Sequence, residues 1–240
     1  MPRFPINSSQ VTGNKAIISG DNFKHIIKVL RFKINDELIL FDEINNEHTG
    51  NIISINKKEL YVEITETKKN LKESSIDINL FQSVPKGSKM DLIVQKTTEL
   101  GVNSITPIRT ERSIVQDSRK IDRWSKIVIE SCKQCGRSQP ARIKEFIDFR
   151  NIFETISDND LNLLFYENNG NKLKDFLSEE KDNYKTINII IGPEGGFTLE
   201  EINYAINKGI KIVGLGPRIL RVETASIAAV SAIQYHFGDL

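Results

Sequence analysis

The sequence has 240 residues and a formal net charge of +1, with 39% hydrophobic and 27% charged residues. These values exclude a disordered chain and allow a sizeable core, and at this length two domains are the natural expectation. No apolar run approaches the ~20 residues that span a bilayer, and the first residues lack the apolar stretch of a secretory signal. We therefore expect a cytoplasmic protein.

Charge is distributed unevenly along the chain. Residues 82–150 contain 14 Lys or Arg and 8 Asp or Glu, whereas residues 151–240 contain 8 and 13. The middle of the chain could therefore present a basic face to a polyanion. Solvated helix faces would give the same counts, so charge alone leaves both interpretations open.

The amino-terminal part predicts a small β-barrel. Short β-branched runs separated by turns predict strands at residues 16–18, 37–41, 51–55 and 60–64. A helical insert is expected at residues 21–31, where Phe23, Ile26, Ile27 and Leu30 recur at helical spacing. The polar residues 66–75 are expected to form a linker.

The rest of the chain alternates strands and helices. Apolar runs predict strands at residues 76–84, 104–108, 161–166, 187–191 and 210–215. Between them, one helix is expected from about Ser88 to Gly101, and another over residues 123–134. This alternation predicts an α/β sheet with helices on both faces.

The cysteines do not indicate a metal site. Cys132 and Cys135 have the spacing of a ligand pair, but no second pair exists, and His25, His48 and His236 are scattered. Packing on a helix face is the better interpretation, and we expect no metal.

In open α/β sheets, ligands bind beyond the carboxyl ends of the strands. A glycine loop, residues 192–197, follows the strand at 187–191, and Thr198 with Glu201 forms a capping box that opens a helix. Such a loop is often only a tight turn. Alternatively, its backbone approaches a ligand closely, and a bulky side chain at Gly195 would then occupy the ligand's space.

The loop after the last strand is rich in charge. Arg218, Arg221 and Glu223 alternate with apolar residues, and Thr224 is expected to cap an alanine-rich final helix. The charges are expected to be buried. Because unpaired buried charge is costly, they would be either a salt-bridged corner or functional groups.

Two motifs resemble the RsmE family, which methylates N3 of a uridine in 16S ribosomal RNA. They are residues 191–197, IGPEGGF, and 215–225, LGPRILRVETA. The resemblance extends to residues 98–102, TELGV, to 136–138, GRS, and to 29–31, VLR. It therefore covers nearly the whole chain. Cys135 and Val222 depart from the family pattern, and neither change removes a charge.

The resemblance implies a fold and an activity. The fold would be a SPOUT methyltransferase domain over residues 74–240, with a carboxyl-terminal trefoil knot, preceded by a PUA-like RNA-binding barrel over residues 1–70. The enzyme would use S-adenosylmethionine (SAM) as cofactor and act on 16S rRNA within the small ribosomal subunit. A homodimer is also implied.

The resemblance assigns residues as well. The implied cofactor contacts are Leu164, Phe165, Tyr166, Glu167, Gly192, Pro193, Glu194, Gly195, Leu215, Gly216, Pro217, Ile219, Leu220, Thr224 and Ala225. Because uracil N3 carries a proton, a cation is needed near the flanking carbonyls, for which Arg221 is the first choice, with Glu223 or Glu194 as proton acceptor. The candidate RNA phosphate contacts are Arg3, Lys28, Arg31, Arg109, Arg112 and Arg137.

Two alternatives stay open at this point. The first is an enzyme of the same fold that methylates another atom, such as a ribose 2′-hydroxyl or a guanine. The second is a non-catalytic rRNA-binding assembly factor. Retention of the glycine loop together with Arg221 and Glu223 argues against the second.

Overall fold

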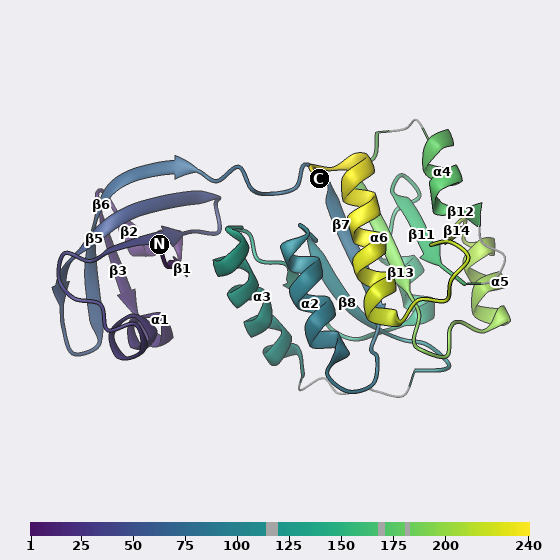
Figure 1. Cartoon of the computed structure of the whole chain (residues 1–240), viewed down its shortest axis with the longest axis horizontal. Helices are drawn as coiled ribbons and strands as arrows, with labels where there is room; N and C mark the ends of the chain where they lie inside the picture. Colours follow the sequence, from purple (N-terminus) through teal and green to yellow (C-terminus); the bar gives the residue numbers. More distant parts are fainter. Residues whose placement is uncertain (114–119, 168–170, 181–182) are drawn as a thin grey trace. The chain divides into compact units, whose positions relative to one another are not determined.

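The computed structural model describes residues 1–240 except 114–119, 168–170 and 181–182 (Figure 1). The chain divides into two compact units. Unit 1 comprises Met1–Glu73 and Ile129–Pro140, and unit 2 comprises Ser74–Val128 and Ala141–Leu240.

Unit 1 is built on a six-stranded mixed sheet. In spatial order its strands are β1 (Arg3–Pro5), β4 (Glu37–Phe41), β5 (Asn46–Ile55), β6 (Glu59–Lys69), β3 (Lys15–Ser19) and β2 (Val11–Thr12). β1 pairs with β4 in parallel, and the other neighbours are antiparallel. The hydrogen-bonded strands form an open series within unit 1, whereas the sequence predicted a barrel.

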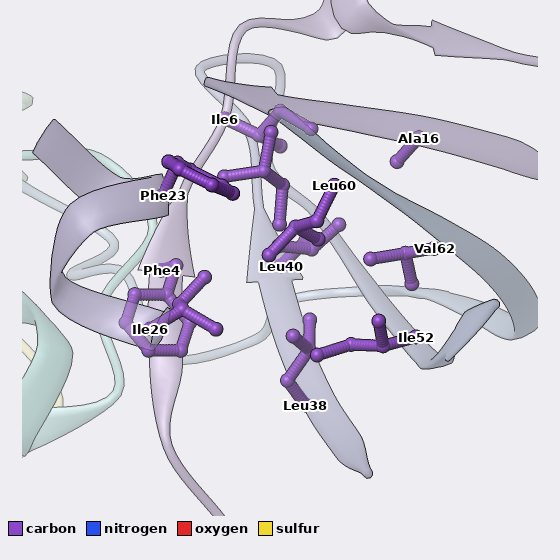
Figure 2. Packing of buried hydrophobic residues seen from close by; sticks show 11 residues of the cluster. Phe4, Ile6, Ala16, Phe23, Ile26, Leu38, Leu40, Ile52, Leu60 and Val62 are labelled. Atoms are coloured by element: carbon purple, nitrogen blue, oxygen red, sulfur yellow. The ribbon is translucent and has the colours of Figure 1, made fainter. Parts of the chain in front are cut away.

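The helical insert of unit 1 covers its core. It consists of α1 (Gly20–Lys24) followed directly by a π-helical turn, η2 (His25–Val29), and a short 3-10 turn, η1 (Ser8–Gln10), precedes β2. Phe23 and Ile26 point from the insert toward strand residues that include Leu40 and Leu60 (Figure 2). The helical spacing of Phe23 and Ile26 in the sequence is therefore explained by one buried face, whereas Leu30 of the same pattern is 37% exposed.

Unit 2 contains an eight-stranded sheet with only parallel pairings among its described strands. In spatial order seven of the strands are β10 (Ile147–Asp148), β8 (Ser104–Arg109), β7 (Asp77–Ser83), β13 (Thr186–Ile191), β11 (Leu161–Phe165), β14 (Lys211–Gly214) and β12 (Asn171–Lys172). The eighth, β9 (Arg142–Ile143), pairs with β8. Parallel pairing brings the carboxyl ends of β7, β13, β11 and β14 to one edge.

Six helices follow Ser83 in the described chain: α2 (Lys89–Glu99), α3 (Ile121–Cys135), η4 (Phe149–Glu154), α4 (Leu173–Glu179), α5 (Leu199–Asn207) and α6 (Val222–Phe237). All belong to unit 2 except the second half of α3, from Ile129, which belongs to unit 1. α6 contacts α2 and β13, and its Ser226 hydroxyl donates to Gln82 Oε1 of β7 at 2.5 Å. A separate apolar cluster joins α5 and η4 to the sheet through Phe81, Leu164 and Ile190.

Several predicted elements are confirmed and others are wrong. The capping box of Thr198 and Glu201 opens α5, and Ser88 is the N-cap of α2. Thr224 is not a cap: α6 begins earlier, with Arg221 as its N-cap, because the carbonyl of Arg221 already accepts the first helical hydrogen bond from Ala225 at 2.8 Å. The predicted linker at 66–75 also begins too early, because residues 66–69 pair with β5.

Candidate functional site

A pocket of about 410 Å³ lies at the carboxyl ends of β11, β13 and β14, within unit 2. Its volume falls within the roughly 300–1,000 Å³ of small-molecule sites. The residues that line it are Lys89, Phe165, Tyr166, Glu167, Ile191, Gly192, Pro193, Glu194, Gly196, Phe197, Leu215, Gly216, Arg218, Ile219, Leu220, Arg221, Val222 and Ala225. The pocket thus combines apolar side chains with backbone and a few charged groups.

Most of the cofactor contacts expected from the sequence meet in this pocket, and four do not line it. Leu164 is fully buried in the apolar cluster beneath α5. Pro217 and Thr224 are exposed, and Thr224 lies within the first turn of α6. The fourth, Gly195, belongs to the glycine loop.

The glycine loop needs small residues for reasons that differ from one position to the next. A Cβ at Gly192 would lie 2.9 Å from the Phe197 ring. Gly196 has a φ of +67°, and a Cβ there would lie 2.6 Å from Glu167 Oε1. A Cβ at Gly195 would instead meet Arg112 side-chain carbons at 3.4 Å, an ordinary contact outside the pocket. In this structure a side chain at Gly195 would therefore point toward Arg112 and away from the pocket lining, and Gly196 is the more constrained position.

Arg112 holds the outer side of this loop. Its Nη1 donates to the carbonyl oxygen of Gly195 at 2.8 Å and, more weakly, to that of Phe197 at 3.5 Å. Because Arg112 follows β8, this guanidinium ties the β8 loop to the β13 loop. The structure thus engages Arg112 with the wall of the pocket, where the sequence analysis assigned it to RNA phosphate.

An ion pair lies across one side of the pocket. Lys89, at the start of α2, donates from Nζ to Glu194 Oε1 at 2.8 Å, and the backbone amide of Lys86 donates to the same oxygen at 3.1 Å. Burial raises the pKa of Glu194, but these hydrogen bonds outweigh burial and hold the pKa below its ordinary value. A carboxylate so stabilised is a weak base, which favours a positioning role over proton acceptance.

The charged residues that follow the last strand, β14, are less buried than the apolar residues beside them in the sequence suggested. Arg218 and Arg221 are exposed, and Glu223 is half-buried. The loop projects from the sheet, so even Ile219 is 84% exposed. The expectation of buried arginines is therefore wrong, and the case for Arg221 depends on its place in the pocket lining. Within the described chain, the Arg221 guanidinium has no ion-pair partner.

Glu223 is two residues beyond Arg221 in the first turn of α6 and does not line the pocket. Its Oε2 is buried and has no hydrogen-bond donor among the described residues. A buried carboxylate oxygen without a donor is costly, which makes this atom a candidate for an interaction that forms only with ligand bound.

Two of the six candidate phosphate contacts lie in largely buried ion pairs. Arg3 pairs with Glu47 and donates from Nη2 to the carbonyl of Gly136 at 2.9 Å. Arg137, only 5% exposed, donates from Nε to Glu73 at 3.0 Å. Both residues belong to unit 1, whereas the sequence analysis placed Arg137 with the catalytic domain. Their geometry is that of structural groups.

Among the other candidates, Arg109 pairs with Asp148 at 2.9 Å and is partly exposed. Lys28 and Arg31 are exposed, and neither forms an ion pair within the described chain. These two are the candidates whose charge is free for an external partner.

The described residues contain no cluster of three or more His, Cys, Asp or Glu able to hold a metal ion. Cys132 is buried and Cys135 half-buried, and neither forms a disulfide. In the same part of the chain no helix has the length and apolar character required to cross a membrane.

Comparison with known proteins identifies the family. An RNA methyltransferase domain family matches residues 72–234, and an RNA methyltransferase PUA domain family matches residues 18–65. The ribosomal RNA small subunit methyltransferase E of Buchnera aphidicola (from Acyrthosiphon pisum) is 38% identical over 100% of this chain and 95% of its own length. This chain belongs to the RsmE family.

Solved structures agree with this membership. The RsmE protein of Neisseria gonorrhoeae, bound to SAM, has a TM-score of 0.91 and 34% identity, over 100% of this chain and 99% of that one. A putative methyltransferase from Legionella pneumophila with bound SAM has a TM-score of 0.89 and 33% identity, over 99% and 98% of the two chains.

This RsmE-family pocket includes residues that the sequence analysis did not assign. They are Lys89, Ile191, Gly196, Phe197, Arg218 and Val222. Lys89 could have been found, because it follows β7 at the same sheet edge as the glycine loop: Gln82 of β7 is in register with Ile191 of β13.

Proposed function

We propose that the chain transfers a methyl group from SAM to N3 of a specific uridine in 16S rRNA of the small ribosomal subunit. The observation that carries the proposal is one pocket shared by the glycine loop and the loop of residues 215–221, in a member of the RsmE family. Two relatives, from Buchnera aphidicola and Bacillus subtilis, are named ribosomal RNA small subunit methyltransferase E, and that name gives small-subunit ribosomal RNA as their substrate.

The pocket fits the cofactor in chemistry and size. Phe165, Ile191 and Leu220 offer apolar surface for an adenine ring, and the glycine loop offers backbone groups unobstructed by side chains. Bound SAM would supply a methyl group on a positively charged sulfur. Two similar structures contain bound SAM, which supports the same ligand here.

The acceptor requires help from the protein. Uracil N3 must lose its proton before its nitrogen lone pair can form the new bond to carbon, as the bond from carbon to sulfur breaks. Arg221, at the pocket's lining and free of an ion pair within the described chain, would stabilise the negative charge that develops on the flanking carbonyl oxygens. Glu223, whose Oε2 has no hydrogen-bond donor among the described residues, would receive the proton.

The proposal includes the trefoil knot of the SPOUT fold in residues 74–240. Support comes from the path of the chain after β14. That strand lies beyond β11, yet the next helix, α6, contacts α2 and β13. The chain must therefore cross back over the sheet before its end. A PUA-like RNA-binding role for residues 1–70 is part of the same proposal, supported by the family match to residues 18–65.

We also propose a homodimer. Tyr235 of α6 is 78% exposed and Ile219 of the pocket lining is 84% exposed, so unit 2 presents apolar side chains that a second copy could cover. Light scattering at micromolar concentration is expected to give twice the mass of the chain, and a monomer would contradict the proposal.

The function is tested by mapping methylated nucleosides in rRNA from cells with and without the gene. We expect loss of one N3-methyluridine in 16S rRNA and its restoration by the purified protein with SAM and small-subunit particles. A missing methyl group on another atom would support an enzyme with a different target. Unchanged rRNA together with particle binding would indicate an assembly factor.

A further inference from the structure

A surface loop of unit 1 combines exposed apolar and cationic side chains. This basic loop comprises residues 28–35. Its apolar members Val29, Leu30 and Ile34 are 67%, 37% and 54% exposed. Its cations, Lys28, Arg31 and Lys33, are exposed, and their side chains form no ion pair in the described part of the chain. Exposed apolar side chains that gather in one place, beside charged residues, indicate an interaction surface.

Two backbone hydrogen bonds attach the basic loop to the rest of unit 1. The amide of Phe32 donates to the carbonyl of Ile26 at 3.1 Å, and that of Asn35 to the carbonyl of Ile52 at 2.8 Å. Inward of the loop, Phe23 and Ile26 are buried in the core (Figure 2). Because these bonds fix the backbone before a ligand binds, binding would lose little conformational entropy of the loop.

The basic loop also contains local strain. Arg31 has a φ of 59° and Asn35 a φ of 76°, in the left-handed region that non-glycine residues seldom adopt. The loop begins within the π-helical turn η2 (His25–Val29), a rare conformation that is frequent at functional sites. Strained residues cluster at binding and active sites, so these two positive φ angles support a functional role for the loop.

The chemistry of the basic loop fits single-stranded RNA. Cations bind phosphates, and apolar side chains pack on base faces that are free only where bases are unpaired. The nearby carboxylates are engaged within unit 1: Asp21 accepts from Lys24 at 2.9 Å, and Asp36 accepts the amide of Lys33 at 2.7 Å. Asp36 and the exposed Glu37 keep their charges, so the three cations of the loop leave a small positive excess over residues 28–37.

We infer that the basic loop is a docking surface for unpaired nucleotides of the RNA substrate. Its cations contact phosphates, and Val29, Leu30 and Ile34 pack against bases. The inference rests on the proposed function and adds to it the place of contact and the preference for unpaired RNA.

Two sets of variants of the full chain separate the two kinds of contact. The first removes charge: Lys28→Ala, Arg31→Ala and Lys33→Ala combined. The second keeps charge and removes apolar surface: Val29→Ser with Ile34→Ser. Lys57→Ala with Lys58→Ala is the matched control, because both lysines are exposed in the turn between β5 and β6. Arg31→Gly adds a variant that removes charge and relieves the positive φ.

Fluorescence anisotropy with a uridine-containing single strand and with its duplex, over a range of salt, measures the contacts. The charge variants are expected to reduce the slope of log affinity against log salt by about 0.7 for each lost phosphate contact. The apolar variant is expected to weaken single-strand binding with an unchanged salt slope and to bind the duplex like the wild type. The control is expected to match the wild type.

Wild-type affinity and slope in both the triple variant and Arg31→Gly would overturn the inference. So would an apolar variant that binds the single strand as tightly as the wild type does. Methylation of small-subunit particles and SAM calorimetry, run on the wild type, test the proposed function separately. A wild type that methylates particles while the loop variants bind RNA normally would leave the proposed function standing and remove the docking surface.

Discussion

Arg112 and Gly195 link two loops at the sheet edge, through a hydrogen bond of 2.8 Å from the guanidinium to the carbonyl oxygen. Arg112 follows β8 and Gly195 follows β13, with β7 between the two strands. The bond fixes the outer side of the glycine loop, whose inner side lines the pocket. An arginine in the middle of the chain thereby shapes a site formed by residues near its end.

Replacing Arg112 is therefore expected to weaken SAM binding. Arg112→Ala removes a partly exposed, charge-assisted hydrogen bond, which corresponds to about 1 kcal/mol, or about fivefold in Kd measured by calorimetry. Arg142→Ala is the control, because Arg142 pairs with Ser104 at the opposite, amino end of β8. Equal Kd values for wild type and Arg112→Ala would show that the loop holds its shape without the bond.

The glycine loop is expected to be sensitive at Gly196 rather than at Gly195. Gly196→Ala places a Cβ at positive φ and 2.6 Å from Glu167 Oε1, so SAM affinity should fall about tenfold or more. Gly195→Ala creates only an ordinary contact with the Arg112 side chain and should leave affinity nearly unchanged. The opposite ranking in calorimetry would place the ligand against Gly195.

Glu194 is expected to act through its ion pair with Lys89. Since its pKa is lowered, the carboxylate is ionised at neutral pH, and the pairing is lost only as pH falls through that lowered pKa. Glu194→Gln should therefore retain single-turnover methyl transfer within about tenfold at neutral pH, because a general base would contribute about 10² to 10⁴. A larger loss at unchanged SAM affinity would identify Glu194 as the proton acceptor.

Arg221→Ala is expected to reduce methyl transfer by about 10² to 10³ without lowering the melting temperature. The guanidinium is exposed, and no ion pair within the described chain would be lost, so the fold does not depend on it. Single-turnover methylation beside thermal melts distinguishes the roles, with Arg142→Ala as the control, because Arg142 lies outside the pocket lining. Early melting with full turnover on cooling would make Arg221 a structural residue.

Arg3 is expected to stabilise unit 1. Its ion pair with Glu47 is largely buried, and Arg3→Ala leaves that carboxylate with only Lys68 at 3.3 Å, a cost on the order of 3 kcal/mol. Burial raises the pKa of Glu47, but Arg3 and Lys68 outweigh burial and lower it. The stabilisation should therefore be present at neutral pH and disappear as pH falls through the lowered pKa. Denaturant melts at several pH values measure it; a stable Arg3→Ala variant would free Arg3 for RNA.

Sequence alone determined the features encoded by local pattern. The parallel strands of unit 2 followed from short apolar runs, and α5 from the capping box of Thr198 and Glu201. The pocket followed from the rule that ligands bind beyond carboxyl ends of strands, together with the family motifs. These signals depend on residues close together in the chain, so they can be read without knowing the fold.

Tertiary structure decided how distant residues share space. Sequence could not show that Arg221 is exposed, that Arg3 faces Glu47, or that Lys89 reaches Glu194. Charge partners of this kind are separated by tens to more than a hundred residues, and only the packing of the strands brings them within hydrogen-bond distance. Gly195 and Gly196 likewise differ in the side chain that an added Cβ would meet. These side chains, Arg112 and Glu167, come from other loops, so the sequence alone does not show the difference.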